Sequence, residues 1–119
     1  MNTILVVDDE YLIVDILGFA LEDAGFIVEK ASNGRKALDA LQDKRVQLVI
    51  TDYMMPVLNG EELVRAIRED LLLTDLPVIL MSGAQANQGL VCPQRFAAVF
   101  DKPFDIDALI AKVRELLDA

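Results

Sequence analysis

The chain has 119 residues, 54% of them hydrophobic, which is enough for one domain with a buried core and too short for two. Its 20 acidic and 11 basic residues give a formal net charge of −9, which argues against direct nucleic-acid binding and favours a metal cation or a basic partner. The chain has no histidine, so the commonest zinc ligand and the usual general base are both excluded.

The first half of the chain alternates predicted strands and helices. Thr3–Val7 contains four consecutive apolar residues and is predicted to be a strand buried on both faces. A helix from about Glu10 to Ala24 follows, because apolar residues recur there with the helical period, and Gly25 ends it. The predicted inner stripe of this helix is Ile13, Ile16, Leu17, Ala20, Leu21 and Ala24. The next predicted elements are a strand over Phe26–Ala31, a helix over Arg35–Asp43 and the central strand over Val46–Thr51.

The second half continues this alternation. Asn59 and Glu62 have the spacing of a capping box and predict the start of a third helix, whose inward residues are Leu63, Ile67 and Leu71. The remaining predicted elements are strands over Pro77–Met81 and Ala97–Asp101 and a last helix that Asp105 caps, with Leu109, Val113 and Leu116 inward. The pattern predicts one α/β domain over residues 1–119, a three-layer α/β/α sandwich with a five-stranded parallel sheet and right-handed crossovers.

The segment Gln85–Arg95 should hold another helix, but its composition opposes one. It contains Gly89 and Pro93. An interior Gly costs ~1 kcal/mol and an interior Pro ~3 kcal/mol relative to Ala. We therefore expect a short or broken element there.

Charged or polar side chains directly follow four of the predicted strands. They are Asp8-Asp9 after the first strand, Asp52 after the central strand, Ser82 after the fourth and Lys102 after the fifth. The carboxyl ends of parallel strands meet at one edge of a sheet, where such folds place their sites. Each of these residues alone could belong to an ordinary turn. Their joint occurrence at strand ends favours a shared functional site.

The acidic residues of this predicted site favour a divalent cation. If their strands are neighbours, Asp8, Asp9 and Asp52 lie close together, and like charges at that range oppose ionisation. All-oxygen ligands without histidine or thiolate select magnesium (Mg²⁺), or manganese (Mn²⁺), over zinc. Lys102 could then hold a phosphoryl oxygen, with Ser82 as a hydroxyl donor. Asp52 is the expected nucleophile, because carboxylates form acyl phosphates.

Four motifs, in this order and spacing, resemble those of response-regulator receiver domains of two-component signalling, the CheY-like family. They are VVDDE at Val6–Glu10, TDYMMP with Asn59-Gly60 at Thr51–Gly60, LMSG at Leu80–Gly83 and DKPF at Asp101–Phe104. The resemblance covers essentially all 119 residues. It implies a flavodoxin-like sheet of strand order 2-1-3-4-5, in which the first and third strands are neighbours.

The resemblance also implies roles for individual residues. Asp52 resembles the phosphoacceptor, and Ser82 and Lys102 resemble the residues that bind the phosphoryl group. The implied metal ligands are Asp8 (through water), Asp9, Asp52 and the backbone carbonyl of Met54. The Lys102–Pro103 peptide bond is expected to be cis, as is usual in the family.

The implied function is a phosphorylation-dependent switch. The phosphoryl donor would be a sensor histidine kinase or a histidine phosphotransfer protein, and the signal would pass to a partner or output domain that the sequence does not name. Because this chain has no histidine, it cannot be that donor itself. We expect no enzymatic activity beyond self-phosphorylation and self-dephosphorylation, and a monomer or weak dimer.

The net charge, the single cysteine and the lack of a long apolar run predict a cytoplasmic domain that binds neither membranes nor nucleic acid directly. No apolar run reaches the roughly 18–20 residues of a spanning helix. The strand pattern begins directly after Met1-Asn2, which leaves no room for a signal peptide. The single cysteine, Cys92, excludes an internal disulfide.

Two further features bear on how the domain would receive and pass on a signal. Leu12, Ile16 and Phe19 share a flank of the first predicted helix, and they are either further core residues or a docking surface for the kinase's helices. Receivers often carry an aromatic residue three positions before the lysine. Here Val99 occupies that position, and Phe100 follows on the opposite face of the strand.

Two other function classes compete with the switch. A Mg²⁺-dependent phosphohydrolase would usually place its nucleophile and its acid/base two residues apart, whereas Asp8 and Asp9 are adjacent and only Glu10 lies two beyond Asp8. The chain also has no cap domain to hold a substrate; multiple turnover of a phosphomonoester would favour this enzyme. A flavodoxin-like cofactor binder needs a phosphate-cradling loop after the first strand, where the three acids would repel a phosphate.

Overall fold

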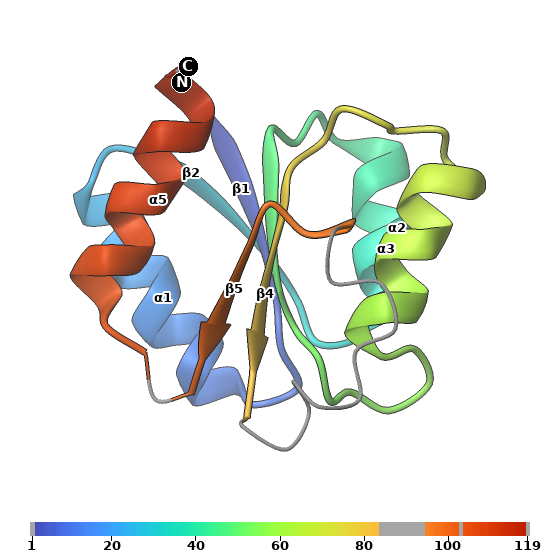
Figure 1. Ribbon diagram of the computed structural model, residues 1–119, viewed down its shortest axis with the longest axis horizontal. Coiled ribbons are helices and arrows are strands. Elements are labelled where there is room, and N and C mark those ends of the chain that lie inside the picture. Colours follow the sequence, from blue (N-terminus) through green and yellow to red (C-terminus); the bar gives the residue numbers. More distant parts are fainter. Residues whose placement is uncertain (1, 84–94, 103, 119) are drawn as a thin grey trace.

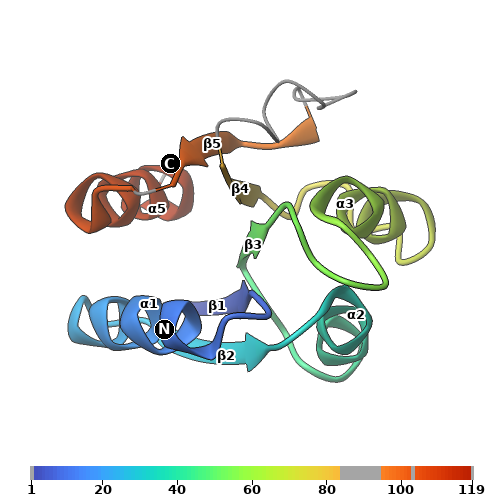
Figure 2. The same cartoon turned by 90° about the horizontal axis from the view of Figure 1, so that it is seen from below.

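Five strands form one parallel sheet in the order β2-β1-β3-β4-β5 in the computed structural model, which describes residues 2–83, 95–102 and 104–118 (Figure 1). The strands are β1 (Thr3–Val7), β2 (Ile27–Ala31), β3 (Leu48–Asp52), β4 (Val78–Ser82) and β5 (Ala98–Asp101). The helices in the described ranges are α1 (Tyr11–Asp23), α2 (Gly34–Asp43), α3 (Gly60–Glu69) and α5 (Ile106–Asp118). Figure 2 shows α1 and α5 on one face of the sheet and α2 and α3 on the other. The predicted layers and strand order are confirmed.

The sheet separates two apolar cores. β1, β3 and β4 lie between other strands, and helices cover both faces of the sheet. Their side chains are therefore buried on both faces, which explains the unbroken apolar runs in their sequences. One core packs β-strand residues against α2 and α3, and the other packs them against α1 and α5. None of the helices in the described part of the chain is long and apolar enough to cross a bilayer.

The register of β1 and β3 positions the acidic residues. Val7 pairs with Thr51, so Asp8 and Asp52 are the next residues of neighbouring parallel strands. β4 then follows β3, with Met81 opposite Asp52. The predicted adjacency of the first and third strands is therefore confirmed.

Side-chain caps fix the helix starts that the sequence predicts. The Asn59 side chain accepts a hydrogen bond from the Glu62 amide at 2.8 Å, and the Glu62 carboxylate accepts one from the Asn59 amide at 2.9 Å. This capping box starts α3 as predicted. The Asp105 carboxylate accepts bonds from the amides of Asp107 and Ala108 at the start of α5.

The predicted inner stripe of α1 is partly wrong. Its buried residues are Val14, Leu17, Gly18 and Leu21. Ile16 is 53% exposed, because at about 100° per residue it lies on the side opposite Val14 and Gly18. The helix is apolar on nearly all sides, so its period could not select the inward face. Two other predictions lie outside the described residues: the short helix over Gln85–Arg95, of which the structure describes only Arg95, and the cis bond before Pro103.

The loop between β3 and α3 contains a strained residue. Val57 has a φ of +74°, and the Leu58 amide donates to the Pro56 carbonyl at 2.8 Å, which is the pattern of a γ-turn. A β-branched side chain is sterically disfavoured at positive φ, whereas glycine is not. Val57 is 79% exposed, so its side chain contributes little packing that would offset the strain.

We therefore expect Val57→Gly to raise the free energy of unfolding by about 1 kcal/mol, because relief of the strain should exceed the extra entropy of glycine in the unfolded chain. Urea denaturation measures the difference. Val57→Ala, which keeps the Cβ atom but removes the branching, should gain less. A glycine variant less stable than wild type would show that the loop is not strained at this residue.

Candidate functional site

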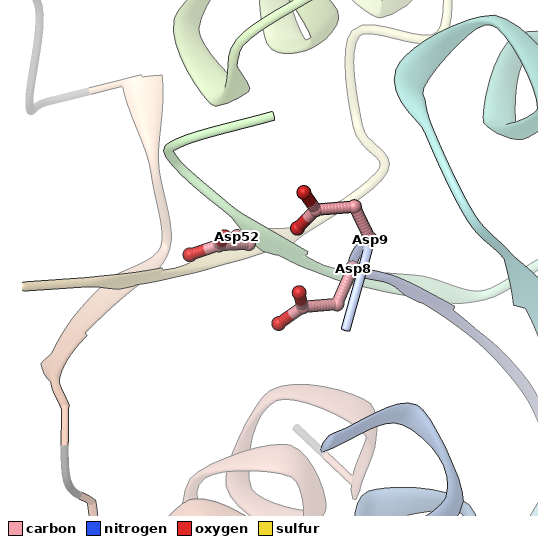
Figure 3. Close-up of side chains that lie close together, drawn as sticks. All are labelled: Asp8, Asp9 and Asp52. Atoms are coloured by element: carbon pink, nitrogen blue, oxygen red, sulfur yellow. The ribbon is translucent and has the colours of Figure 1, made fainter. Parts of the chain in front are cut away.

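The carboxylates of Asp8, Asp9 and Asp52 gather at the carboxyl ends of β1 and β3, where they face a common space (Figure 3). Each offers an oxygen atom, and these atoms all lie within 4.8 Å of one another. Asp8 and Asp52 are buried, with 1% and 5% exposure, whereas Asp9 is exposed. The structure thus forms the acidic cluster that the sequence predicts, with two acids inside and one at the entrance.

Lys102, which directly follows the edge strand β5, brings a positive charge into this cluster. Its Nζ lies 3.1 Å from Oδ1 of Asp52 and 3.2 Å from Oδ2 of Asp8. Its amide donates to the Ser82 carbonyl at 2.8 Å, which holds the residue after β5 against the end of β4. Lys102 therefore reaches both buried acids, as a residue that binds a phosphoryl oxygen would need to.

Burial governs the ionisation of the two inner acids. It raises the pKa of Asp8 from 3.8 to about 6, with the charge of Asp52 acting in the same direction and the Glu10 amide and Lys102 opposing it. Burial also raises the pKa of Asp52, against the hydrogen bond and charge of Lys102. Burial lowers the pKa of Lys102, but its contacts with Asp52 and Asp8 outweigh that effect, and the net pKa is raised. The lysine therefore stays charged while the acids hold protons more readily than surface carboxylates do.

The donor set fits a hard divalent cation. Three carboxylates converge with only oxygen ligands, and the chain has no histidine to attract zinc. Lys102 offers one positive charge against three carboxylates, so the ionised cluster stays negative. Asp9 is exposed, so a hydrated ion can reach the cluster without a rearrangement of the core.

The other predicted phosphoryl and metal residues lie around the same strand ends. Ser82 is fully buried as the last residue of β4, next to the register pair of Asp52 and Met81. Met54 lies two residues beyond Asp52, with an exposed side chain. Predicted positions for these residues at the edge of the sheet agree with the structure, while their roles remain predictions.

Val99 and Phe100 face opposite sides of β5, as predicted. Val99 is 38% exposed, whereas Phe100 is partly buried and packs against the core between the sheet and the α1–α5 layer. The position that often carries an aromatic residue in receivers therefore presents a small apolar side chain here.

The exposed face of α1 is apolar. Leu12, Ile16 and Phe19 are 62%, 53% and 70% exposed, so the interpretation of this flank as further core is wrong. They share one side of the helix, opposite its buried stripe. Scattered apolar residues need no explanation, but a group on one helix face indicates an interaction surface.

The sequence did not predict the contacts that Glu10 makes at the site. The Glu10 carboxylate lies 4.0 Å from Nζ of Lys102, and the Glu10 amide donates to Oδ1 of Asp8 at 2.9 Å. The only sequence signal was its position directly after Asp9, which is equally typical of a solvated helix start.

Comparisons with known proteins agree with this geometry. A profile of the family described as "Response regulator receiver domain" matches residues 4–114. The phosphate regulon transcriptional regulatory protein PhoB of Pseudomonas aeruginosa is 32% identical over 118 residues, which cover 98% of this chain and 52% of PhoB. The response regulator Rre1 of Synechocystis sp. is 36% identical over 118 residues, which cover 97% of this chain and 51% of Rre1.

The fold also matches solved structures. The response regulator TrrA from Thermotoga maritima, in complex with Mg²⁺-BeF, has a TM-score of 0.87 and 32% identity, covering 98% of this chain and 99% of TrrA. The chain spans about half the length of the curated relatives it matches.

Proposed function

Because this chain belongs to the response regulator receiver domain family of two-component systems, we propose that Asp52 is its phosphoacceptor. One observation carries the proposal: Asp52 is a buried carboxylate on the central strand, 3.1 Å from Nζ of Lys102 and clustered with Asp8 and Asp9. A carboxylate in this position can attack a phosphoryl group whose charge its neighbours neutralise.

The transfer uses Asp52 as the nucleophile. Its carboxylate oxygen forms a bond to phosphorus while the bond from phosphorus to the donor's histidine nitrogen breaks, and the imidazole leaves with that electron pair and takes up a proton. Lys102 turns from the acids to the incoming phosphoryl oxygens, and Ser82 donates a hydrogen bond to them. Both residues therefore stabilise charge where it develops.

A metal ion completes the proposed site. Asp9, Asp52 and the Met54 carbonyl would hold Mg²⁺, or Mn²⁺ with the same ligand preference, and Asp8 would act through water. When bound, the ion would supply positive charge that neutralises part of the negative charge of the phosphoryl group. The Mg²⁺-BeF complex of TrrA, a structural relative, supports this assignment.

The first test is the intact mass of the wild-type protein after incubation with acetyl phosphate and Mg²⁺. We expect one added phosphoryl group, which EDTA prevents. Continuous release of phosphate from a phosphomonoester would instead favour the phosphohydrolase, and no adduct under any condition would overturn the proposal.

The donor is proposed to be a sensor histidine kinase or a histidine phosphotransfer protein that docks on Leu12, Ile16 and Phe19. This surface is apolar, exposed and on the helix that begins directly after the acidic cluster. The domain is proposed to act in the cytoplasm as a monomer or weak dimer, without binding nucleic acid or membranes, and to pass the signal to a separate output domain or partner.

We expect Leu12→Asp to slow phosphotransfer from a purified, phosphorylated kinase core at least tenfold, because a charge in an apolar contact must be desolvated. Labelling by acetyl phosphate should stay unchanged. Leu72→Asp is a matched control: Leu72 is 74% exposed between α3 and β4, away from the site, and its φ of +57° suits aspartate. Equal effects of the two variants on transfer would contradict the docking surface.

A further inference from the structure

Glu10 is the N-cap residue of α1, but its side chain makes no capping hydrogen bond. The N-cap position favours Ser, Thr, Asp or Asn, whose short side chains reach the first free amides. The Glu10 side chain makes no such bond. Its carboxylate lies instead 4.0 Å from Nζ of Lys102, while its amide is fixed by the 2.9 Å bond to Asp8. The Glu10 side chain therefore places a charge at the site without capping the helix.

The Glu10 side chain is exposed beside Lys102. It is 65% exposed, and it lines two hollows at this edge of the sheet. One, of about 420 Å³, is lined also by Ile13, Lys102, Phe104 and Ile106. The other, of about 280 Å³, is lined also by Asp9, Tyr11 and Leu12. The first hollow is lined by both Glu10 and Lys102, so an anion inside it would lie near both charges.

We propose that Glu10 is a specificity-determining residue that disfavours small, highly charged phosphodonors at Asp52. The inference rests on the function proposed above. Glu10 adds a third carboxylate beside Lys102, after Asp8 and Asp52, so an anionic donor that approaches the lysine is also repelled by Glu10. A protein donor can offset that repulsion through contacts with the apolar face of α1, whereas a free anion has no such compensation.

Donor charge gives the inference a quantitative signature. With acetyl phosphate, the Asp52 oxygen bonds to phosphorus while the bond to the acetyl oxygen breaks, and acetate leaves with the electron pair. With phosphoramidate, the phosphorus–nitrogen bond breaks and ammonia leaves. At neutral pH acetyl phosphate is a dianion, whereas phosphoramidate carries one negative charge fewer. Coulomb energy is proportional to charge, so the repulsion by Glu10 is about twice as large for acetyl phosphate as for phosphoramidate. The fold-increase in rate on removal of Glu10 should therefore be, for acetyl phosphate, about the square of the fold-increase for phosphoramidate.

The experiment compares Glu10→Gln with wild type, using both donors and intact mass against time. We expect the rate to rise about threefold with phosphoramidate and about tenfold with acetyl phosphate at low salt, and both effects to shrink at high ionic strength. Mg²⁺ is held at a level where doubling it leaves the rates unchanged. Glu22→Gln makes the same change near the other end of α1 and should leave both rates within about twofold of wild type.

Each other outcome overturns the inference. Equal rises with the two donors would mean that Glu10 merely restrains Lys102, and unchanged or lower rates would mean that it does not select by charge. A response from Glu22→Gln as large as that from Glu10→Gln would assign the effect to net charge. If wild type accepts phosphate from neither donor, the proposed function itself fails. If wild type is labelled but the two donors respond to Glu10→Gln in another way than expected, only the inference about Glu10 fails.

Discussion

Asp52→Asn should form no phosphoryl adduct under conditions that label wild type fully. Asparagine keeps the shape of the side chain but loses the nucleophilic carboxylate, and no other acid in the described part of the chain is both buried and on the central strand. Intact mass with acetyl phosphate and Mg²⁺ measures the loss. Asp39→Asn, on the exposed side of α2, makes the same substitution away from the site and should label like wild type.

Hydroxylamine distinguishes the bond that forms. An acyl phosphate on Asp52 should be released by hydroxylamine, whereas a phosphoester on a hydroxyl such as Ser82 should resist it. A wild-type adduct that survives hydroxylamine, or any adduct on Asp52→Asn, would contradict the assignment. Asp9→Asn should label slowly but keep the hydroxylamine-sensitive bond, because it alters the metal site and leaves the nucleophile in place.

The site was predictable because it follows from strand ends. Apolar runs such as Thr3–Val7 have no polar alternation, so they had to be buried on both faces, and helices on both sides then required a parallel sheet. Parallel strands end at one edge, which placed Asp8 and Asp52 at the same edge of the sheet, where the structure pairs their strands. The strand order itself came only from the resemblance, since several orders would satisfy the same pattern.

The face of α1 could not be derived in the same way. Val14 and Ile16 are both apolar and two residues apart, and helical periodicity places them on opposite sides without saying which is inward. Only the packing of α1 beside α5 on the sheet decides it. The contacts of Lys102 were equally out of reach, because Asp8 is 94 residues away and a long flexible side chain could have met either acid, both or neither.

Asp8→Asn should make the metal-free protein more stable than wild type at neutral pH. Burial raises the pKa of Asp8 from 3.8 to about 6. Above pH 6 the folded protein must therefore hold an ionised carboxylate that the unfolded chain solvates better, a cost on the order of 3 kcal/mol. Asparagine removes that charge and keeps an oxygen that can accept the Glu10 amide. Loss of the Lys102 contact offsets part of the gain, so we expect about 2 kcal/mol from urea denaturation in EDTA at pH 7.5.

The pH dependence identifies the cause. A group whose folded pKa lies above its unfolded pKa favours the folded state at low pH, and this contribution is lost as pH rises through the folded value. Wild type should therefore gain stability between pH 7 and pH 4.5 relative to Asp8→Asn, and the two should converge at the acid end. A constant difference across this range would show that packing, not ionisation, separates them.

Magnesium should reverse the order of stability. An ion that binds only the folded state stabilises it by mass action, and wild type has the full set of carboxylates to bind it. Saturating Mg²⁺ should raise the free energy of unfolding of Asp8→Asn less than that of wild type. Asp9→Asn should also gain little from Mg²⁺. Because Asp9 is exposed, this variant should not be more stable than wild type in EDTA either. The buried carboxylates would then lower the stability of the metal-free protein and, as ligands, strengthen metal binding, because the ion offsets their charges. An Asp8→Asn variant less stable than wild type in EDTA at pH 7.5 would contradict this account.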